Sequence, residues 1–350
     1  MVEKLRPETG KKPVVGLAGF FGYGNYGDEL FVSVYKQFLQ DDFDLRFLSD
    51  QLTKPYYSKP LEEVVAGVDA IIIGGGDIVQ PWNLDPRYFS KEFLAKPVFV
   101  IGVGVPLRSG ANMNPNHTEK DWVVKKYAEF FNHPSVKLIH GRDDQTCTWI
   151  RGKTNPAIGV IEAPDVVCAL TLPPATRPSA GQEVLGIVTR QRPNQEDDYT
   201  QINALADQQR ARGWKIRHII LGTGEVGARD SADAADVTGA KELIYTESLD
   251  ELSRAIGSCT ALVSMKFHGT VVATMYGVPS TVLIPTNKNR NFMKRIGRSD
   301  LISRFDDETL CSRFNPVPAP LDLIAIEMLR SRATDVMERL RTGLHAVIGR

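Results

Sequence analysis

A lysine and a histidine lie two positions apart in the segment Ser264-Met265-Lys266-Phe267-His268-Gly269-Thr270. The apolar run 261–263 precedes this segment and a helix-like run from 271 to 276 follows it, so Lys266 and His268 stand where a strand gives way to a helix N-terminus. Free backbone N–H groups and the positive end of the helix dipole favour an anion there. A lysine adds a point charge, and a histidine adds a group that exchanges protons near neutral pH. The pattern predicts an anion site with proton transfer; a solvent-facing lysine beside a capping histidine is the structural alternative.

A second group of candidates is Gly74-Gly75-Gly76-Asp77, directly after the apolar run 69–73. Consecutive glycines cost conformational entropy unless the backbone must adopt a positive φ or approach another group closely. We therefore expect Gly75 and Gly76 to line a crevice and Asp77 to point into it. Asp77 would accept a proton from a sugar hydroxyl or would cap the next helix, and the residue types leave both roles open.

The segment Gly22-Tyr23-Gly24-Asn25-Tyr26-Gly27 fits the spacing G-x-G-x-x-G between a strand and a helix, which is typical of dinucleotide sites. Asp50 lies near the end of the next strand, where a ribose-binding acid would belong. Asp28 argues against a dinucleotide, because its charge would face the pyrophosphate. The alternatives are a turn that admits a neutral sugar, with Asn25 and Asp28 binding its hydroxyls, and a purely structural tight turn.

Two arginines follow strand-like segments: Arg142 after 136–139 and Arg190 after 184–188. A guanidinium binds carboxylate or phosphate through two parallel hydrogen bonds, so each arginine is a candidate anion clamp. A surface pair with a neighbouring acid is the alternative for each, and His140 is expected to be structural. A later basic set is expected on a solvated face, although its first two members could reach an anion; it comprises Lys288, Arg290, Lys294 and Arg295.

Strand-like runs of near-continuous apolar content alternate with helical patterns along the chain, which predicts parallel sheets covered on both faces. A linker rich in Pro, Gly and Ser at 173–181 divides two such series. We expect an α/β protein with two doubly wound, Rossmann-like domains at 1–172 and 182–318. The terminal segment 319–350 should be a helix that either crosses back to the first domain or pairs with another subunit. Every candidate follows the carboxyl end of a strand, so the cleft between the domains is the predicted site.

Composition excludes several classes of protein. The 350 residues carry a formal net charge of zero and no long basic run, which argues against nucleic-acid binding. The four cysteines are widely spaced with no C-x-x-C pair, so neither a disulfide framework nor a zinc site is expected, and no other metal site is evident. The charged segment 1–12 has no apolar signal core, and no apolar run approaches the roughly 18 residues of a membrane span. We expect a cytoplasmic protein, with peripheral contact at the inner face of the membrane left open.

Seven motifs occur in a fixed order: G-x-G-N-x-G-D-E, G-G-G, V-I-G-V-G, G-R-D-D, P-D, M-K-F-H-G and A-T-M-Y-G-V-P. From about residue 14 to about 301 this order resembles the polysaccharide pyruvyl transferase family. The resemblance implies two domains similar to those of GT-B glycosyltransferases and transfer of a pyruvyl group from phosphoenolpyruvate onto two sugar hydroxyls as a cyclic ketal. It also implies that Lys266, Phe267 and His268 occupy the family's R-L-H donor segment and that Arg142 is a second anion-binding position. Lysine in place of arginine keeps the positive charge but cannot form the bidentate hydrogen bonds of a guanidinium.

The resulting hypothesis is an enzyme that needs no cofactor besides its donor, phosphoenolpyruvate, and that acts on a saccharide precursor of a cell-surface or exopolysaccharide, whether or not the acceptor is lipid-linked. Lys266 and Arg142 would bind the donor's charges, and His268 would be the general acid. Asp77 or Asp28 would be the base on the opposite wall of the cleft. A glycosyltransferase with a nucleotide-sugar donor is the first alternative, and a non-catalytic or dinucleotide-binding protein is the second. The oligomeric state stays open.

Overall fold

The computed structural model describes residues 12–107, 117–191 and 198–349, so the charged segment 1–11 and its predicted lack of a signal core lie outside the described residues. The first sheet has six parallel strands in the order β2-β1-β3-β4-β5-β6. They are β1 (Val14–Ala18), β2 (Asp44–Phe47), β3 (Ala70–Gly76), β4 (Val98–Val103), β5 (Val136–Gly141) and β6 (Val160–Glu162). The helices of this half are α1 (Tyr26–Leu39), α2 (Leu61–Ala66), α3 (Asp121–Phe131) and α4 (Asp144–Thr154), with 3₁₀ turns η1 (Lys91–Ala95) and η3 (Val166–Ala169).

The second sheet has five parallel strands in the order β11-β10-β7-β8-β9. They are β7 (Val184–Val188), β8 (Lys215–Ile219), β9 (Glu242–Ile244), β10 (Ala261–Ser264) and β11 (Ser280–Val282). Its helices are α5 (Thr200–Ala211), α6 (Gly224–Ala232), α7 (Leu249–Gly257), α8 (Phe267–Met275), α9 (Asn287–Arg295) and α10 (Leu310–Arg313), with 3₁₀ turns η4 (Asp233–Asp236) and η5 (Ser299–Leu301). The expected α/β architecture with two parallel sheets is confirmed.

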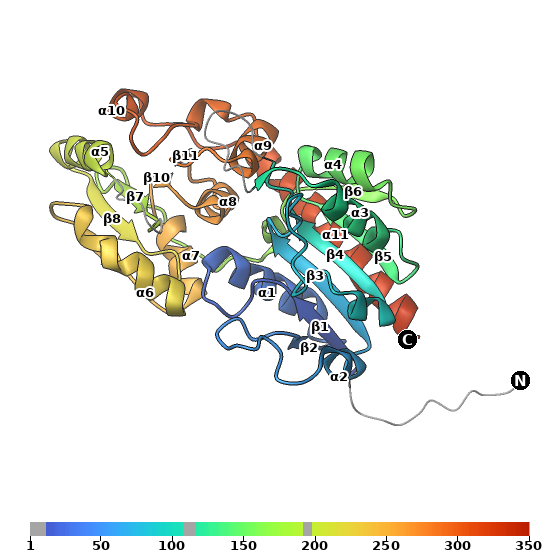
Figure 1. The fold of residues 1–350 in the computed structure, drawn as a ribbon. Coiled ribbons are helices and arrows are strands. Elements are labelled where there is room, and N and C mark those ends of the chain that lie inside the picture. The colour runs from blue at the N-terminus through green and yellow to red at the C-terminus, as the bar shows by residue number, and fades with distance from the viewer. Residues whose placement is uncertain (1–11, 108–116, 192–197, 350) are drawn as a thin grey trace, which may run out of the picture.

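Central strands are buried along their whole length, as their apolar runs predict. Every residue of β1, β4, β7 and β10 is buried, because helices cover both faces of each sheet (Figure 1). Edge strand β2 is mostly exposed, and its sequence is correspondingly polar. The largest hydrophobic core cluster joins the two halves, since it includes side chains of α1, η3, α7 and α8. The two sheets are thus held by one continuous apolar layer.

The last helix, α11 (Leu323–Ile348), returns to the first half of the molecule. Figure 1 shows it in red beside the first sheet, where it contacts η3, α1 and β5. Arg341 and His345 both contact Asp42, the former at 2.7 Å and the latter at 3.1 Å. The crossing predicted for this segment is confirmed. The domain boundaries at 172, 182 and 318 stay a prediction, although the two sheets fall on opposite sides of 173–181.

Local differences from the expected elements are small. Helix α1 begins at Tyr26 rather than at Asp28, because the Asn25 side chain accepts a hydrogen bond from Gly27 N and caps the helix earlier. Helix α6 has no counterpart in the sequence-based pattern, since it contains two glycines and a weak apolar periodicity. Among the described residues, no helix is long and apolar enough to cross a membrane.

Candidate active site

A cavity of about 200 Å³ lies between the two halves, at the carboxyl ends of β1, β3, β5, β7 and β10. Strands β1 and β3 in one sheet, and β7 and β10 in the other, are the neighbours at which strand order reverses, and open α/β sheets bind ligands there. Nine of the ten residues selected from the sequence line the cavity: His268, Asp77, Asp28, Lys266, Phe267, Arg142, Asn25, Gly76 and Arg190. The tenth, Gly75, is not part of this lining and faces Phe21 and Phe31, so its placement in the crevice was wrong. Gly75 and Gly76 do have the expected positive φ, at 90° and 81°.

The turn into α8 is held by side chains and leaves the helix start open. Ser264 Oγ accepts from Lys266 N at 3.2 Å and donates to Lys266 O at 2.8 Å, which fixes the backbone before the helix. Lys266 is the N-cap residue and makes no side-chain capping bond, so the first N–H groups of α8 are not capped by it. Its Nζ instead donates to Leu221 O at 2.5 Å and pairs with the buried Asp230. Burial lowers the pKa of Lys266, against the opposing effect of Asp230.

His268 contacts a carboxylate from the other half of the molecule. Its Nε2 lies 3.3 Å from Asp165 Oδ2, and Asp165 is 1% exposed. The other Asp165 oxygen accepts from Val167 N at 3.0 Å, so the carboxylate is held in place by the start of η3. Burial lowers the pKa of His268 below its usual range, although Asp165 acts in the opposite direction. Gly27 packs so closely on the imidazole that any Cβ there would collide with Nδ1. His268 is therefore fixed from two sides by residues of the first half.

A buried arginine forms the centre of a second charged cluster. Arg142 pairs with Asp77, and its Nη1 lies 3.5 Å from Asp165 Oδ2; Lys288 Nζ lies 3.1 Å from the other Asp77 oxygen. The Phe267 ring packs against both cations, with centroid distances of 5.1 Å to Arg142 and 5.7 Å to Lys288. Within the described structure, Arg142 Nε and Nη1 are buried and have no hydrogen-bond partner. Arg142 thus lines the cavity with hydrogen-bond donors that the protein itself does not satisfy, which suits an anionic ligand.

Asp28 and Asp77 share the cavity but differ in charge state. Burial would raise the pKa of Asp77, yet Arg142 and Lys288 outweigh it and hold that pKa well below its usual range. Burial raises the pKa of Asp28 to about 7, because nearby cations compensate it only in part. The Asp28 Oδ1 lies 3.3 Å from where a Cβ of Gly76 would be. Near neutral pH the Asp28 carboxyl can therefore exist in both protonation states, whereas Asp77 stays ionised.

The glycine-rich turn before α1 is already occupied by the protein's own carboxylate. Glu29 Oε1 accepts from Gly22 N at 2.8 Å and from Gly24 N at 3.0 Å. Asn25 Oδ1 accepts from Gly27 N at 3.3 Å, so its amide oxygen is used as a helix cap. These N–H groups are not free to bind a pyrophosphate, which removes the main physical argument for a dinucleotide at this turn.

Several site residues were not selected from the sequence. Asp165 enters the sequence analysis only as the acid of the P-D motif, although its position at the carboxyl edge of the first sheet is the signal that could have marked it. Lys288 was expected on a solvated face, but it lines the cavity because α9 begins there. Asp230 lies within α6 and carried no sequence signal. Arg142 was expected either to bind an anion or to pair with a neighbouring acid; Asp143 instead caps α4, accepting from Thr146 N at 2.8 Å.

The lining of the cavity is net cationic. Five basic residues line it against three carboxylates: Arg142, Arg190, Arg229, Lys266 and Lys288 face Asp28, Asp77 and Asp230. Helices α1, α8 and α9 all begin at its wall, which adds three positive helix ends. Among the described residues, no group of three or more His, Cys, Asp or Glu side chains is placed to hold a metal ion. The arrangement suits a small, multiply charged anion beside a proton-transferring histidine.

Solved structures place the fold in a known class. S. aureus MnaA, in its UDP co-structure, superposes with a TM-score of 0.61 at 9% identity, covering 97% of each chain. The Neisseria meningitidis UDP-GlcNAc 2-epimerase bound to UDP-GlcNAc gives a TM-score of 0.61 at 11% identity, covering 94% of this chain and 99% of that one. At such identities the likeness concerns the fold, which is the GT-B-like arrangement of two parallel-sheet α/β units.

The family is defined by sequence. The family model of polysaccharide pyruvyl transferases matches residues 25–287, a range that contains every cavity residue except Lys288 and Asn289. This chain belongs to the polysaccharide pyruvyl transferase family. Among curated proteins, no relative matches it significantly.

Proposed function

We propose that this enzyme transfers a pyruvyl group from phosphoenolpyruvate to two hydroxyls of a saccharide, forming a cyclic ketal and inorganic phosphate. The observation that carries the proposal is the His268–Asp165 pair at 3.3 Å beside the uncapped start of α8, in a cationic cavity of about 200 Å³. Phosphoenolpyruvate carries a phosphate and a carboxylate, and two separate cation groups face the cavity. One contains Arg142 and Lys288, and the other contains Lys266 and Arg190.

The reaction adds one proton to a carbon of phosphoenolpyruvate and removes one proton from each of the two sugar hydroxyls. C3 of the donor gains a proton and becomes a methyl group, while C2 loses its bond to the phosphate oxygen and gains bonds to two sugar oxygens. Of the two hydroxyl protons released, one balances the proton added to C3 and the other leaves with the phosphate. His268, as an imidazolium held by Asp165, is the general acid for C3. Arrival of the anionic donor would raise the pKa of His268, since nearby negative charge favours the imidazolium.

Asp28 is the proposed base for the sugar hydroxyl. Its pKa of about 7 lets it accept a proton at neutral pH and release it again, which the strongly ionised Asp77 does poorly. Asp77 instead holds Arg142 and Lys288 at the cavity before the donor arrives. Phe267, buried beneath both cations, positions them rather than contacting substrate directly. This divides the two candidate carboxylates of the first half between a base and a positioning residue.

A glycosyltransferase with a nucleotide-sugar donor is the second candidate. Its support is that the two similar structures are complexes with UDP and with UDP-GlcNAc. Against it, the cavity of about 200 Å³ is smaller than the roughly 300–1,000 Å³ typical of sites that enclose larger ligands. A compact donor fits this closed arrangement better than a nucleotide sugar does.

Calorimetric titration separates the two candidates. Phosphoenolpyruvate is titrated into wild type, His268→Ala and Lys266→Gln, with UDP- and GDP-sugars as parallel titrants and thermal melting to verify folding. We expect saturable phosphoenolpyruvate binding that weakens in both variants, and no heat from the nucleotide sugars. Nucleotide-sugar binding without phosphoenolpyruvate binding, tested both with and without added saccharides, would contradict the proposal and favour the glycosyltransferase.

A further inference from the structure

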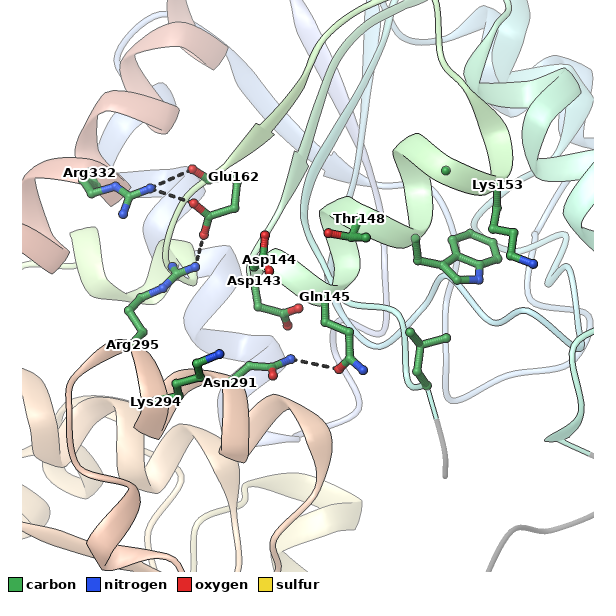
Figure 2. Close-up of a pocket in the computed structure, with 13 residues that line it drawn as sticks. Asp143, Asp144, Gln145, Thr148, Lys153, Glu162, Asn291, Lys294, Arg295 and Arg332 are labelled. Atoms are coloured by element: carbon green, nitrogen blue, oxygen red, sulfur yellow. Dashed lines mark hydrogen bonds and ion pairs between the residues drawn. The ribbon is translucent and has the colours of Figure 1, made fainter. Parts of the chain in front are cut away.

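A second, larger cavity of about 870 Å³ lies outside the candidate active site, between α4 of the first half and α9 of the second (Figure 2). Arg295 and Arg332 close one end of it, where both pair with Glu162. Figure 2 shows the side chains of α4 and α9 facing each other across the space. The cavity therefore depends on both halves of the molecule, as the active-site cavity does.

The two cavities are neighbours on the same two elements. Arg142 lines the inner cavity, and the next two residues, Asp143 and Asp144, line the outer one. On α9, Lys288 lines the inner cavity and Asn291 the outer one, one helical turn further on. A hydrogen bond from Asn287 Nδ2 to Leu107 O also joins the start of α9 to the first half of the molecule. The two cavities are thus lined by residues close to one another in sequence, both after β5 and on α9.

The charges of the outer cavity are largely compensated by the protein itself. Glu162 accepts from Arg332 at 2.9 Å as well as from Arg295, and Lys153 pairs with Glu119 at 2.7 Å. Glu162 offsets only one of the two arginine charges, so one arginine charge and Lys294 remain. In the described lining these two positive charges are balanced by Asp143 and Asp144, and the formal sum is zero. The outer cavity therefore lacks the cationic excess of the inner one and is not built for a multiply charged anion.

Neutral hydrogen-bonding groups make up the middle of the outer cavity. Asn291 Nδ2 donates to Gln145 Oε1 at 3.1 Å across the space, which leaves the Gln145 amide nitrogen and the Asn291 carbonyl oxygen for a ligand. The exposed hydroxyl of Thr148 lies one turn along α4 from Asp144. Trp149 and Leu107 supply apolar wall. Closely spaced donors and acceptors beside apolar surface match a polyhydroxylated ligand with apolar ring faces.

We infer that the outer cavity binds the saccharide chain of the acceptor, next to the sugar that receives the pyruvyl group. This inference rests on the proposed function, since it assigns the reacting sugar and the donor to the inner cavity. The volumes support this assignment of ligands to the two cavities. The inner cavity of about 200 Å³ cannot hold neighbouring sugars in addition to the reacting ones, whereas the outer cavity of about 870 Å³ can hold them. The enzyme would accordingly recognise an oligosaccharide and bind the matching free monosaccharide weakly.

The test fills the outer cavity without disturbing the inner one. Gly152 lines the outer cavity, and a Cβ built on it meets nothing within 4 Å, so the backbone there accepts a side chain and Gly152→Trp adds bulk at the cavity wall. Gly159 also has an open Cβ position but is absent from the lining, so Gly159→Trp is the matched control. Thr148→Val replaces only a hydroxyl by a methyl group. The probe is an array of defined bacterial oligosaccharides and their component monosaccharides, with phosphoenolpyruvate titrated separately into each variant.

We expect wild type and Gly159→Trp to retain one class of oligosaccharide, and Gly152→Trp to bind it about tenfold or more weakly. Thr148→Val should weaken the same binding by about 2- to 10-fold, the usual loss for one hydrogen bond. All four proteins should bind phosphoenolpyruvate equally. Retention of no oligosaccharide, or equal retention by Gly152→Trp, overturns the inference and leaves the donor assignment standing. Oligosaccharide retention that depends on Gly152 without any phosphoenolpyruvate binding overturns the proposed function and leaves the saccharide site standing.

Discussion

Two strand-to-helix turns face the inner cavity from opposite sheets, and they differ in what their backbone N–H groups contact. The turn between β1 and α1 is rich in glycine, and Glu29 accepts hydrogen bonds from Gly22 and Gly24. The turn between β10 and α8 is stabilised by Ser264, whose hydroxyl bonds to both backbone groups of Lys266 and leaves the helix start uncapped. Only the second turn can offer its helix N-terminus to an anion.

The difference shows that a glycine spacing defines the shape of a turn and not its ligand. An internal carboxylate within one helical turn of the glycines, here Glu29, occupies the N–H groups that a pyrophosphate would need. The α8 turn has fewer glycines, yet Lys266 and His268 lie at its open end. The four predictions below test this contrast, beginning with the variant expected to have the largest effect.

His268→Ala should lower the rate of ketal formation by about 10²- to 10⁴-fold, since it removes the proposed general acid at the α8 turn. The rate is measured as phosphate release with a saccharide identified by the array. Gly27→Ala should also lower the rate, because its Cβ would displace the imidazole, although it leaves every charged side chain in place. A His268→Ala enzyme with an unchanged rate would contradict the assignment.

Lys266→Gln should weaken phosphoenolpyruvate binding about 10-fold or more, because a buried charge-assisted contact at the helix start is lost. Arg190→Gln removes the exposed member of the same cation group, so its effect should be smaller and should stay below about threefold. Dissociation constants are measured by calorimetry. Thermal melting verifies that Lys266→Gln still folds with the buried Asp230 left without its ion-pair partner. An equal loss of phosphoenolpyruvate affinity in both variants would mean that Lys266, at the α8 turn, contributes no more to binding than Arg190 does.

The raised pKa of Asp28 makes both activity and stability depend on pH. Activity should rise with pH along a limb near pH 7, as the base ionises. Asp77→Asn should move that limb to lower pH, because the Asp77 charge contributes to the raised pKa of Asp28, and Asp28→Asn should abolish the limb. The folded carboxyl binds its proton more tightly than the unfolded one, so its contribution to stability is full below about pH 4 and is lost as pH rises through 7. Asp28→Asn should therefore be more stable than wild type at pH 8, by about 1–3 kcal/mol. Urea unfolding at pH 5 and 8 measures this, and equal stability of the two proteins at pH 8 would argue against a buried, proton-binding Asp28.

Glu29→Ala should affect the fold and not the chemistry. Removing the carboxylate leaves Gly22 and Gly24 N–H groups without their partner and should lower the free energy of unfolding by about 1–3 kcal/mol. Glu29→Gln, which keeps an accepting oxygen, should lose less. Phosphoenolpyruvate affinity should not change in either variant. Binding of a nicotinamide dinucleotide to wild type would show that the glycine turn is a ligand site after all.

Much of the fold and about half of the cavity lining follow from local patterns in the sequence. Buried apolar strands alternating with helices predict parallel sheets, and the rule that ligands lie beyond strand carboxyl ends selected Asp77, Arg142 and Lys266, which the structure brings to one cavity. The order of motifs identified the family, which the match over residues 25–287 confirms.

What could not be predicted depends on packing between distant segments. Asp230 becomes a site residue only because α6 brings it against Lys266, 36 positions later in the chain. The contrast between Asp28 and Asp77 likewise arises from the cations that surround each carboxyl, which no local spacing encodes. Gly75 was misplaced because a positive φ indicates a turn without showing which side of it faces the cavity.

The contact between His268 and Asp165 joins segments 103 positions apart, one from each half of the molecule. If the halves separate to admit substrates, the imidazole leaves its carboxylate, and the positive charge needed for protonating carbon is no longer stabilised. An open enzyme would then bind its donor without protonating it, because His268 is separated from Asp165. Hydrolysis of the donor before the acceptor binds would thereby be suppressed. The proposed general acid would then be active only when the molecule has closed around both substrates.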